Sequence, residues 1–546
     1  MRVLAAAFLL FAGASSAQED AFWFDDLLSH LRVPSEFKLS VFTDKVGSVR
    51  SLALSPTGIV YATQGRSNNG VVYGCRDTDG DGSALSPGEC WPVTAPMIQP
   101  NGIAFMGTDL FVAMIDRICV IRDVDTDPTT IKDCVQILGP ESSEGAADGL
   151  PTYTHHGWRY LTADPVTQTL AVAIGAPCNV PWTSGSSGGV ADCANQGAGG
   201  TAFPLLSTVA TLNPDGSEFQ VAARGVRNSV GITYHPDTGE MWFTDNGRDQ
   251  WGSSGSSATP DTSASPPDEL NRLGSPGAAM PDFGFPECYG RELPDTAIDG
   301  QGRPFNPSGQ CDQEQYIGSV SELPSHSAAL GLRFYNESAF PARYHGSCFI
   351  AEHGSWNRDP PSGFVLSTVD VGDPATATAV TSLERKTDAT YEEFMTGFRL
   401  YPKVECSSTA DCPGNSTCQM GAPNIDNGPY CGGRGRPVDV EVLRDGTVLL
   451  SDDMNGLIYR IEYIGDGDAQ DAGSAAGASA VAGLVRSEPL WWMLCSALMG
   501  MAVTLGVLGC ARLCCRREPQ SEGGSRGGSL LTQPLAAAYS GGKEAL

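Results

Sequence analysis

The stretch GITYHPDTGEMWFTDNG, residues 231–247, contains two short apolar runs separated by a turn that carries Pro, Asp and Gly. Apolar side chains alternate with polar ones in the first run, as in a strand with one buried face. The second run ends in acidic and small residues. Such a turn between two short apolar runs is typical of antiparallel strands. The stretch therefore predicts a β-hairpin.

The same pattern recurs along the chain, with no helical period between the copies. The other copies are SLALSPTGIVYATQ from residue 51, GIAFMGTDLFVAMI from 102, YLTADPVTQTLAVAIG from 160, GLRFY with YHGSCFIAEHG from 331, and DVEVLRDGTVLLSDD from 439. Repeated hairpins of this kind indicate four-stranded antiparallel blades, and six blades close a β-propeller. We therefore predict an all-β fold, a six-bladed β-propeller, with a sandwich or two smaller β-domains as the alternative. The later copies are farther apart, so we expect the later blades to carry long inserted loops.

Both ends of the chain carry signals for the secretory pathway and for a membrane. Met1 and Arg2 precede an uncharged run that ends in small residues, as in a cleaved signal peptide. A second uncharged run is long enough to cross a bilayer, and three arginines follow it closely. We expect a single-pass type I protein of the cell surface or a secretory-pathway membrane, with the propeller extracellular or lumenal. The expected segments are a signal peptide over 1–17, the propeller over 18–463, a flexible stalk over 464–489, one transmembrane helix over 490–511 and a cytoplasmic tail over 512–546.

The charge of the chain excludes one class of partner. The formal net charge is −29. A protein that binds nucleic acid through electrostatics needs a basic surface, so we expect no nucleic-acid partner.

Thirteen of the 17 cysteines precede the stalk, and in a secreted chain they predict disulfides. Cys406, Cys412, Cys418 and Cys431 form a Cys-rich insert over 406–431 with two bridges, whose connectivity the sequence leaves open. Cys348 is expected to stay unpaired on an apolar strand. Two glycosylation sequons, at Asn336 and Asn415, agree with an extracellular location. Closeness in sequence suggests the local pairs Cys75–Cys90, Cys119–Cys134, Cys178–Cys193 and Cys288–Cys311.

The segment DTDGDG, residues 77–82, has the aspartate spacing of the start of an EF-hand loop. The twelfth position from Asp77 is Gly88, however, and the acid falls one residue later at Glu89. We therefore expect a tight turn or a structural calcium loop, and not a calcium sensor.

Several motifs together resemble a known enzyme family. In chain order they are HHGWRY, VAIGAPCNV, ARGVRNSVGITYHPDTGEMWFTDNGRD, PPDELNRL, FGFPECYG, FIAEHGSWNR and GRPVDV. They are similar to the sorbosone and pyranose dehydrogenase branch of the quinoprotein sugar dehydrogenases, which are relatives of soluble glucose dehydrogenase. The resemblance runs from about Val33 to Tyr463. It implies a propeller that binds pyrroloquinoline quinone (PQQ) and calcium on one face and oxidises a sugar hydroxyl or aldehyde.

The resemblance also implies a catalytic base. The family pattern of His, any residue, Gly, any residue and a basic residue places the base at His155. A neutral histidine suits proton removal from a hydroxyl near neutral pH. We expect His156 to point to the opposite face, because neighbouring side chains alternate in a strand. Ala176 stands where glucose-oxidising relatives have an orienting aspartate, so a backbone carbonyl or Asn179 must orient His155 instead.

The cofactor carries three carboxylates, and planar arginines bind carboxylates through two hydrogen bonds. The resemblance implies that Arg227 with Asn228 holds the quinone, and that Arg434 or Arg436 reaches its carboxylates or carbonyls. Arg358 is expected to replace a lysine of the glucose enzymes, and Trp356 to stack on the cofactor or the sugar. The remaining candidate is Arg66.

The resemblance implies calcium ligands as well. The cofactor's calcium is expected to bind the backbone carbonyls of Gly247 and Arg248, since calcium prefers oxygen ligands. Glu269 resembles a ligand of a second, structural calcium.

Two other functions compete with the dehydrogenase. One is a cell-surface propeller that binds a ligand without catalysis, which the stalk and the anchor would suit. The other is a calcium-dependent lactonase, which needs a ring of carboxylates where the motif loops offer mostly arginines. The chain contains no Cys-x-x-Cys-His haem motif. We therefore expect a sugar substrate, and a separate protein or small mediator as the electron acceptor.

Overall fold

The computed structural model describes most of the chain between residues 24 and 465. The described residues are 24–66, 68–140, 149–152, 155–180, 206–251, 264–274, 280–298, 304–312, 315–356, 358, 360–372, 389–399, 418–419, 430–431 and 434–465. The predicted signal peptide, most of the stalk, the predicted membrane helix and the tail lie outside these ranges. Within them, no helix is long and apolar enough to span a membrane.

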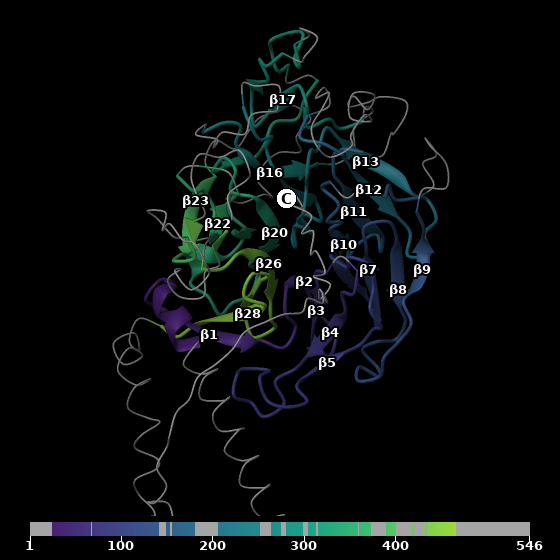
Figure 1. The fold of residues 1–546 in the computed structure, drawn as a ribbon, viewed down its shortest axis with the longest axis vertical. Coiled ribbons are helices and arrows are strands. Elements are labelled where there is room, and N and C mark those ends of the chain that lie inside the picture. Colours follow the sequence, from purple (N-terminus) through teal and green to yellow (C-terminus); the bar gives the residue numbers. More distant parts are fainter. Residues whose placement is uncertain are drawn as a thin grey trace, which may run out of the picture. The chain divides into compact units, whose positions relative to one another are not determined.

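The described chain forms six four-stranded antiparallel sheets, which confirms the predicted fold class (Figure 1). The first three blades each use four consecutive strands. They are β2 (Val49–Leu54), β3 (Val60–Gln64), β4 (Val72–Cys75) and β5 (Cys90–Pro92); β6 (Ile103–Met106), β7 (Asp109–Ala113), β8 (Ile118–Ile121) and β9 (Val135–Leu138); β10 (Leu161–Ala163), β11 (Leu170–Ile174), β12 (Thr208–Leu212) and β13 (Gln220–Arg224).

The next two blades carry the longer insertions, as expected from the spacing of the copies. In the fourth blade a two-stranded hairpin lies between the third and fourth strands. A short 3-10 helix precedes the second strand of the fifth blade, and a two-stranded sheet follows its fourth strand. The elements are β14 (Ile232–Tyr234), β15 (Met241–Asp245), β16 (Asp268–Leu273), β17 (Cys288–Tyr289), β18 (Leu293–Pro294) and β19 (Ser321–Leu323); β20 (Ala329–Phe334), η2 (Ala342–Tyr344), β21 (Cys348–Glu352), β22 (Val365–Asp370), β23 (Thr390–Met395), β24 (Cys418–Gln419) and β25 (Tyr430–Cys431).

The sixth blade joins the two ends of the propeller. Its first three strands are β26 (Pro437–Val442), β27 (Val448–Asp452) and β28 (Leu457–Tyr463), and its outer strand is the N-terminal β1 (Phe37–Thr43). A short helix over residues 24–30 precedes β1. The pairing runs antiparallel from Phe37 opposite Tyr463 to Val41 opposite Tyr459. Two segments separated by about 400 residues therefore hold the ring closed.

The first strands of the blades form a closed inner ring. Each of β2, β6, β10, β14, β20 and β26 contacts the first strand of the next blade, and β26 contacts β2. In Figure 1 β2, β10, β20 and β26 lie toward the centre, whereas β5, β9, β13, β23 and β1 lie outside. The second strands β11, β15, β21 and β27 are buried along their whole length. Adjacent blades cover both faces of these strands, which explains why their sequences are apolar runs. Each fully buried Val or Leu there stabilises the fold by about 1.5–3 kcal/mol.

The strand directions define two faces of the propeller. In each antiparallel blade one edge contains the start of the first strand, the end of the second and the start of the third. We call this side the strand-start face. The chain leaves β23 and enters β26 at this face, so the Cys-rich insert 406–431 is attached there. Apart from β24 and β25, that insert lies outside the described residues.

The disulfides agree with the local pairs expected from the sequence. Cys75–Cys90, Cys119–Cys134 and Cys288–Cys311 are formed, and Cys348 is buried and unpaired. Cys178 is also disulfide-bonded, and its expected partner Cys193 lies outside the described residues. In the insert, Cys418 is the backbone partner of Cys431 across β24 and β25.

The loop that resembles an EF-hand turns tightly. The Asp77 carboxylate accepts hydrogen bonds from the backbone of Gly80 and Gly82, both of which have positive φ. Oxygens of Asp77, Asp79 and Glu89 lie within 4.8 Å of one another. Glu89 is held by the loop itself, through Thr78 and the backbone of Ser86. The hydrogen bonds within the loop thus explain the turn.

Candidate active site

Every predicted site residue lies at the strand-start face. His155 precedes β10, Arg227 and Asn228 precede β14, and Arg434 and Arg436 precede β26, so these five lie where first strands begin. The others follow second strands or begin a third: Arg66, Gly247, Arg248, Trp356, Arg358 and Glu269. Residues that are up to 370 positions apart thus meet on one side of the propeller.

The paired histidines adopt a geometry that corrects one expectation. His155 and His156 form a turn, and their ring centroids are 4.1 Å apart at a tilt of 53°. The prediction that His156 points to the opposite face is therefore wrong. The cause is a φ of 51° at His156, because this left-handed conformation breaks the alternation of a strand. A Cβ on Gly175 would lie 2.6 Å from the Cβ of His156, so the turn needs glycine there.

The two rings have different surroundings. His156 is buried, and its Nδ1 lies 2.8 Å from the Ala176 carbonyl oxygen. His155 is only partly buried, and its Nε2 has no hydrogen-bond partner among the described residues. Burial and the nearby Arg227 guanidinium lower the pKa of His155 to about 4, against a smaller opposing effect of Asp249. His155 is therefore neutral at pH 7, as a proton acceptor must be.

Arg227 and Asn228 are held rigidly. The Arg227 guanidinium donates to the Asn246 carbonyl, at 3.1 Å, and to both oxygens of Asn179, at 2.8 and 3.0 Å. The Asp245 carboxylate accepts the backbone N–H groups of Arg227 and Asn228 at 2.8 and 2.6 Å. Asn179, one of the two groups proposed to orient His155, thus orients Arg227.

Asp249 lies between a guanidinium and an imidazole. Its carboxylate is 3.5 Å from Arg227 Nη2 and 3.7 Å from His326 Nδ1. His326, Arg227 and His155 lower the pKa of Asp249 and outweigh its burial. We call Arg227, Asp249 and His326 the Asp249 cluster. The sequence motifs contain Asp249, but nothing in its local pattern indicated this role.

A second cluster of the same residue types was missed by the sequence reasoning. The Asp453 carboxylate is 2.9 Å from Arg50 Nη1 and 2.9 Å from His353 Nε2. We call Arg50, Asp453 and His353 the Asp453 cluster. Arg50 also stacks 4.3 Å from the Trp158 ring centroid. A Cβ on Gly65 would lie 2.3 Å from Arg50 Cγ, so glycine makes room for this stack.

The remaining predicted arginines have different contacts. Arg436 donates to the backbone carbonyls of His353 and Gly354. Arg358 donates to the Ser325 carbonyl at 2.7 Å. Arg434 is partly buried, and the burial lowers its pKa. The Trp356 side chain and Arg66 are exposed on the same face.

The predicted calcium ligands lie in a buried acidic region. The Arg248 side chain pairs with Asp295 at 2.6 Å, and both side chains are inaccessible to solvent. This pair fixes the backbone from which the Gly247 and Arg248 carbonyls project. Glu269 accepts hydrogen bonds from Asn271 Nδ2 and from the Gly290 backbone. Burial raises the pKa of both Glu269 and Asp245, and the repulsion between these two carboxylates adds to the effect for Glu269.

Several buried polar atoms on the strand-start face have no partner among the described residues. Among them are three guanidinium donors, Arg50 Nη2, Arg358 Nε and Arg434 Nε, and two ring nitrogens, His155 Nε2 and His353 Nδ1. Buried polar groups are normally hydrogen-bonded, so such a set marks a place where a polar ligand completes the bonding. The guanidinium donors fit a ligand that carries carboxylate or carbonyl oxygens.

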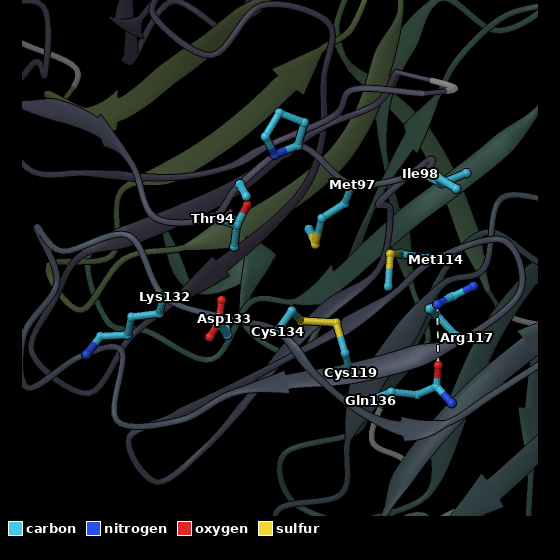
Figure 2. Close-up of a pocket in the computed structure, with 12 residues that line it drawn as sticks. Thr94, Met97, Ile98, Met114, Arg117, Cys119, Lys132, Asp133, Cys134 and Gln136 are labelled. Atoms are coloured by element: carbon cyan, nitrogen blue, oxygen red, sulfur yellow. Dashed lines mark hydrogen bonds between the residues drawn. A yellow bond between two sulfur atoms is a disulfide. The ribbon is translucent and has the colours of Figure 1, made fainter.

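A separate pocket of about 300 Å³ lies at the second blade (Figure 2). It is bounded by the connection from β5 to β6, the turn after β7, and β9, and none of the predicted site residues lines it. The Cys119–Cys134 disulfide and the Arg117–Gln136 hydrogen bond form one side in Figure 2. This pocket is therefore distinct from the candidate active site.

Comparison with known proteins identifies the relatives of this chain. Residues 159–463 match the TrAA12-like family. An uncharacterized protein of Borreliella burgdorferi is 26% identical over 449 residues, which cover 80% of this chain and 92% of that protein. A pyrroloquinoline quinone-dependent pyranose dehydrogenase of Coprinopsis cinerea is 28% identical over 163 residues, which cover 28% of this chain and 21% of that enzyme.

Two solved structures share the fold. The PQQ domain of the Coprinopsis cinerea pyranose dehydrogenase, in its holo form, superposes with a TM-score of 0.53 at 17% identity. A Trichoderma reesei protein of Carbohydrate-Active Enzymes Family AA12 superposes with a TM-score of 0.55 at 17% identity. In both cases the match covers 79% of this chain and 97% of the other. At these identities the likeness establishes the propeller fold.

Proposed function

The chain belongs to the TrAA12-like family, and on that premise we propose that it is a quinoprotein that oxidises a sugar with PQQ and calcium. The observation that carries this proposal is the set of buried guanidinium donors on the strand-start face that no described residue satisfies. The named activity of the pyranose dehydrogenase relative supports the same conclusion. We propose a pyranose or a sorbosone-like aldehyde as the substrate class.

The residues present fit the proposed cofactor. PQQ carries three carboxylates, and Arg358 and Arg434 each offer a buried nitrogen that no described residue satisfies. Arg227 is already held by carbonyl and amide oxygens, so its position is fixed before any ligand binds. Such preorganised donors bind an anionic ligand with little reorganisation. Arg227, Asn228, Arg358, Arg434 and Arg436 would hold the cofactor.

PQQ, when bound, supplies an electrophilic quinone that accepts a hydride from the substrate carbon. The chain must then remove the proton of the substrate hydroxyl. His155 suits this role because it is neutral at pH 7, partly accessible, and carries a ring nitrogen without a partner among the described residues. His156 is buried and holds the turn through the Ala176 carbonyl, so the more accessible His155 is the better candidate for this task.

Calcium would bind at the predicted oxygens of this face. The carbonyls of Gly247 and Arg248 are fixed by the buried pair of Arg248 and Asp295. Glu269 would hold a second calcium, whose charge would stabilise the ionised form of this buried carboxylate. We further propose that the acceptor of the electrons is a separate protein or mediator, and that a single C-terminal helix anchors the propeller at a membrane.

The proposal is tested by reconstituting the purified full-length chain with PQQ and calcium and measuring sugar-dependent reduction of an artificial dye. The substrate panel should contain aldoses, ketoses and sorbosone. Dye reduction that requires sugar, PQQ and calcium together is expected. Tight binding of PQQ without dye reduction by any sugar would contradict the proposed activity.

A further inference from the structure

Asp453 holds two side chains that come from different blades. Arg50 lies at the start of β2, and His353 directly follows β21. Each is 2.9 Å from one oxygen of the Asp453 carboxylate, which itself follows β27. Arg50 and His353 are buried. The three residues therefore form a rigid unit across the junction of blades one, five and six.

The carboxylate fixes the tautomer of His353. Burial and the neighbouring Arg436 guanidinium lower the pKa of His353 to about 4, so the ring is neutral at pH 7. The hydrogen bond from His353 and the ion pair with Arg50 outweigh burial, hold Asp453 ionised and keep its pKa well below the ordinary range. An ionised carboxylate can only accept hydrogen bonds, so the proton of the neutral ring lies on Nε2. Nδ1 then carries a lone pair, and this buried atom has no partner among the described residues.

Arg50, the other partner of Asp453, offers a hydrogen-bond donor. Arg50 donates through Nη1 to Asp453 and through Nε to Asn101 Oδ1, at 3.3 Å. Its Nη2 is buried and has no acceptor among the described residues. The Asp453 carboxylate thus fixes two nitrogens that have no partner among the described residues, the acceptor His353 Nδ1 and the donor Arg50 Nη2. A carboxylate ligand would satisfy only the donor, whereas the hydroxyl groups of a polyhydroxylated ligand can both accept from Arg50 and donate to His353.

We propose that Arg50 and His353 form a hydroxyl-binding pair for the sugar substrate, and that Asp453 is the positioning residue that orients both. This inference rests on the proposed function, because it assigns the recognition of a polyhydroxylated substrate to this part of the same face. The stack of Arg50 on Trp158 and the absence of a side chain at Gly65 keep the guanidinium in place. Together these contacts would distinguish sugars by the position of a hydroxyl.

The first test is the state of His353 in the full-length chain labelled with ¹⁵N-histidine, which contains seven histidines. Long-range ¹⁵N–¹H spectra, assigned with a His353→Gln variant, should show a protonated Nε2 and a bare Nδ1 at pH 7. Saturating glucose, galactose, mannose or xylose should shift the Nδ1 resonance. A proton on Nδ1, or no shift with any of these sugars, would overturn the proposal. This readout does not require PQQ, so it separates the hydroxyl site from the proposed quinoprotein activity.

The second test compares two aspartates of the sixth blade. Asp453→Asn should raise the KM for sugar by roughly 10- to 100-fold, the loss expected when hydrogen bonds to charged groups are weakened. Its affinity for PQQ, measured by calorimetry, should change by less than about 3-fold, below the effect of one hydrogen bond. Asp445→Asn is the control, because Asp445 is exposed in the turn between β26 and β27 at the opposite edge of the blade.

The outcomes of this comparison are distinct. A rise in KM together with a shift of the pH dependence of kcat/KM supports positioning, since a merely structural role would not move that pH profile. Equal losses in PQQ affinity and sugar KM would place the cluster in the cofactor site and overturn the proposal. If Asp453→Asn fails to fold by circular dichroism, His353→Gln replaces it with the same expected rise in KM.

Discussion

The Asp249 and Asp453 clusters contain the same residue types, an arginine, an aspartate and a histidine, at different distances. In the Asp453 cluster both contacts to the carboxylate are 2.9 Å. In the Asp249 cluster they are 3.5 and 3.7 Å. The short contacts in the Asp453 cluster hold Arg50 and His353 in fixed positions. The Asp249 cluster, with its longer contacts, adjoins His155 and the predicted calcium carbonyls. We interpret the Asp249 cluster as the half of the site that binds metal and, together with Arg358, Arg434 and Arg436, the cofactor. The Asp453 cluster is then the half that binds substrate.

The largest expected difference between the two halves concerns the base. His155→Ala should lower kcat by about 10²- to 10⁴-fold, the usual contribution of general base catalysis. His353→Gln should mainly raise KM, because His353 binds the substrate in this account. Steady-state dye reduction separates the two effects. His156→Ala is the control for the neighbouring ring, with a loss of stability expected from its burial but with retained turnover. An equal loss of kcat in His155→Ala and His353→Gln would break the assignment of the halves.

The next difference concerns the two arginines. Arg227→Lys should weaken PQQ binding by roughly 10- to 100-fold, since lysine keeps the charge but loses the planar fork. Arg50→Lys should leave PQQ binding within about 3-fold and raise the KM for sugar instead. Calorimetry with PQQ and kinetics with sugar measure the two quantities on the same protein. If Arg50→Lys weakened PQQ binding more than Arg227→Lys, the assignment of cofactor and substrate to the two clusters would be reversed.

A smaller effect concerns stability in acid. His353 has a folded pKa of about 4, below its ordinary value of 6.5, so its neutral form is favoured in the folded state. Its contribution to stability is therefore present above pH 6.5 and is lost as the pH falls toward 4. The loss is on the order of 2–3 kcal/mol in the free energy of unfolding. His353→Gln should flatten the pH dependence in this window, as measured by urea unfolding. A wild-type stability that stays constant from pH 7 to 4 would contradict the described environment of His353.

The smallest effect concerns the buried carboxylates beside the Asp249 cluster. The raised pKa of Glu269 means that its contribution to stability is present at low pH and is lost as the pH rises. Without metal, Glu269→Gln should therefore raise the free energy of unfolding at pH 8 by about 1–2 kcal/mol. Calcium should stabilise the wild type more than this variant, as shown by thermal unfolding. Equal stabilisation of the wild type and the Glu269→Gln variant by calcium would show that Glu269 is not a calcium ligand.

The sequence predicted the six blades because each copy of the hairpin carries its own alternating pattern. It did not predict that β1 completes the sixth blade, since that pairing depends on a partner about 400 residues away. The local disulfides were predictable for the same reason as the blades, since their partners are close in sequence.

Residues on family motifs could be proposed as site residues from the sequence, whereas residues that depend on contacts between blades could not. Arg50 sits inside a repeat copy and looks like any polar strand residue, and only the fold brings it to Asp453 and His353. The direction of His156 was wrong because a single positive φ reverses it. The repeat copies do end in acidic residues near positions 245 and 453, and this signal could have directed attention to the ends of second strands.

Binding of PQQ is tested most directly by a calorimetric titration of the purified full-length chain with PQQ, in calcium and again in chelator. We expect tight binding at one site per chain in calcium, and binding weakened at least about 10-fold in chelator, where the metal's contacts to the cofactor are lost. Absence of binding at every calcium concentration would contradict this expectation. The chain would then be a propeller that keeps the arrangement of the face and binds another ligand without this chemistry.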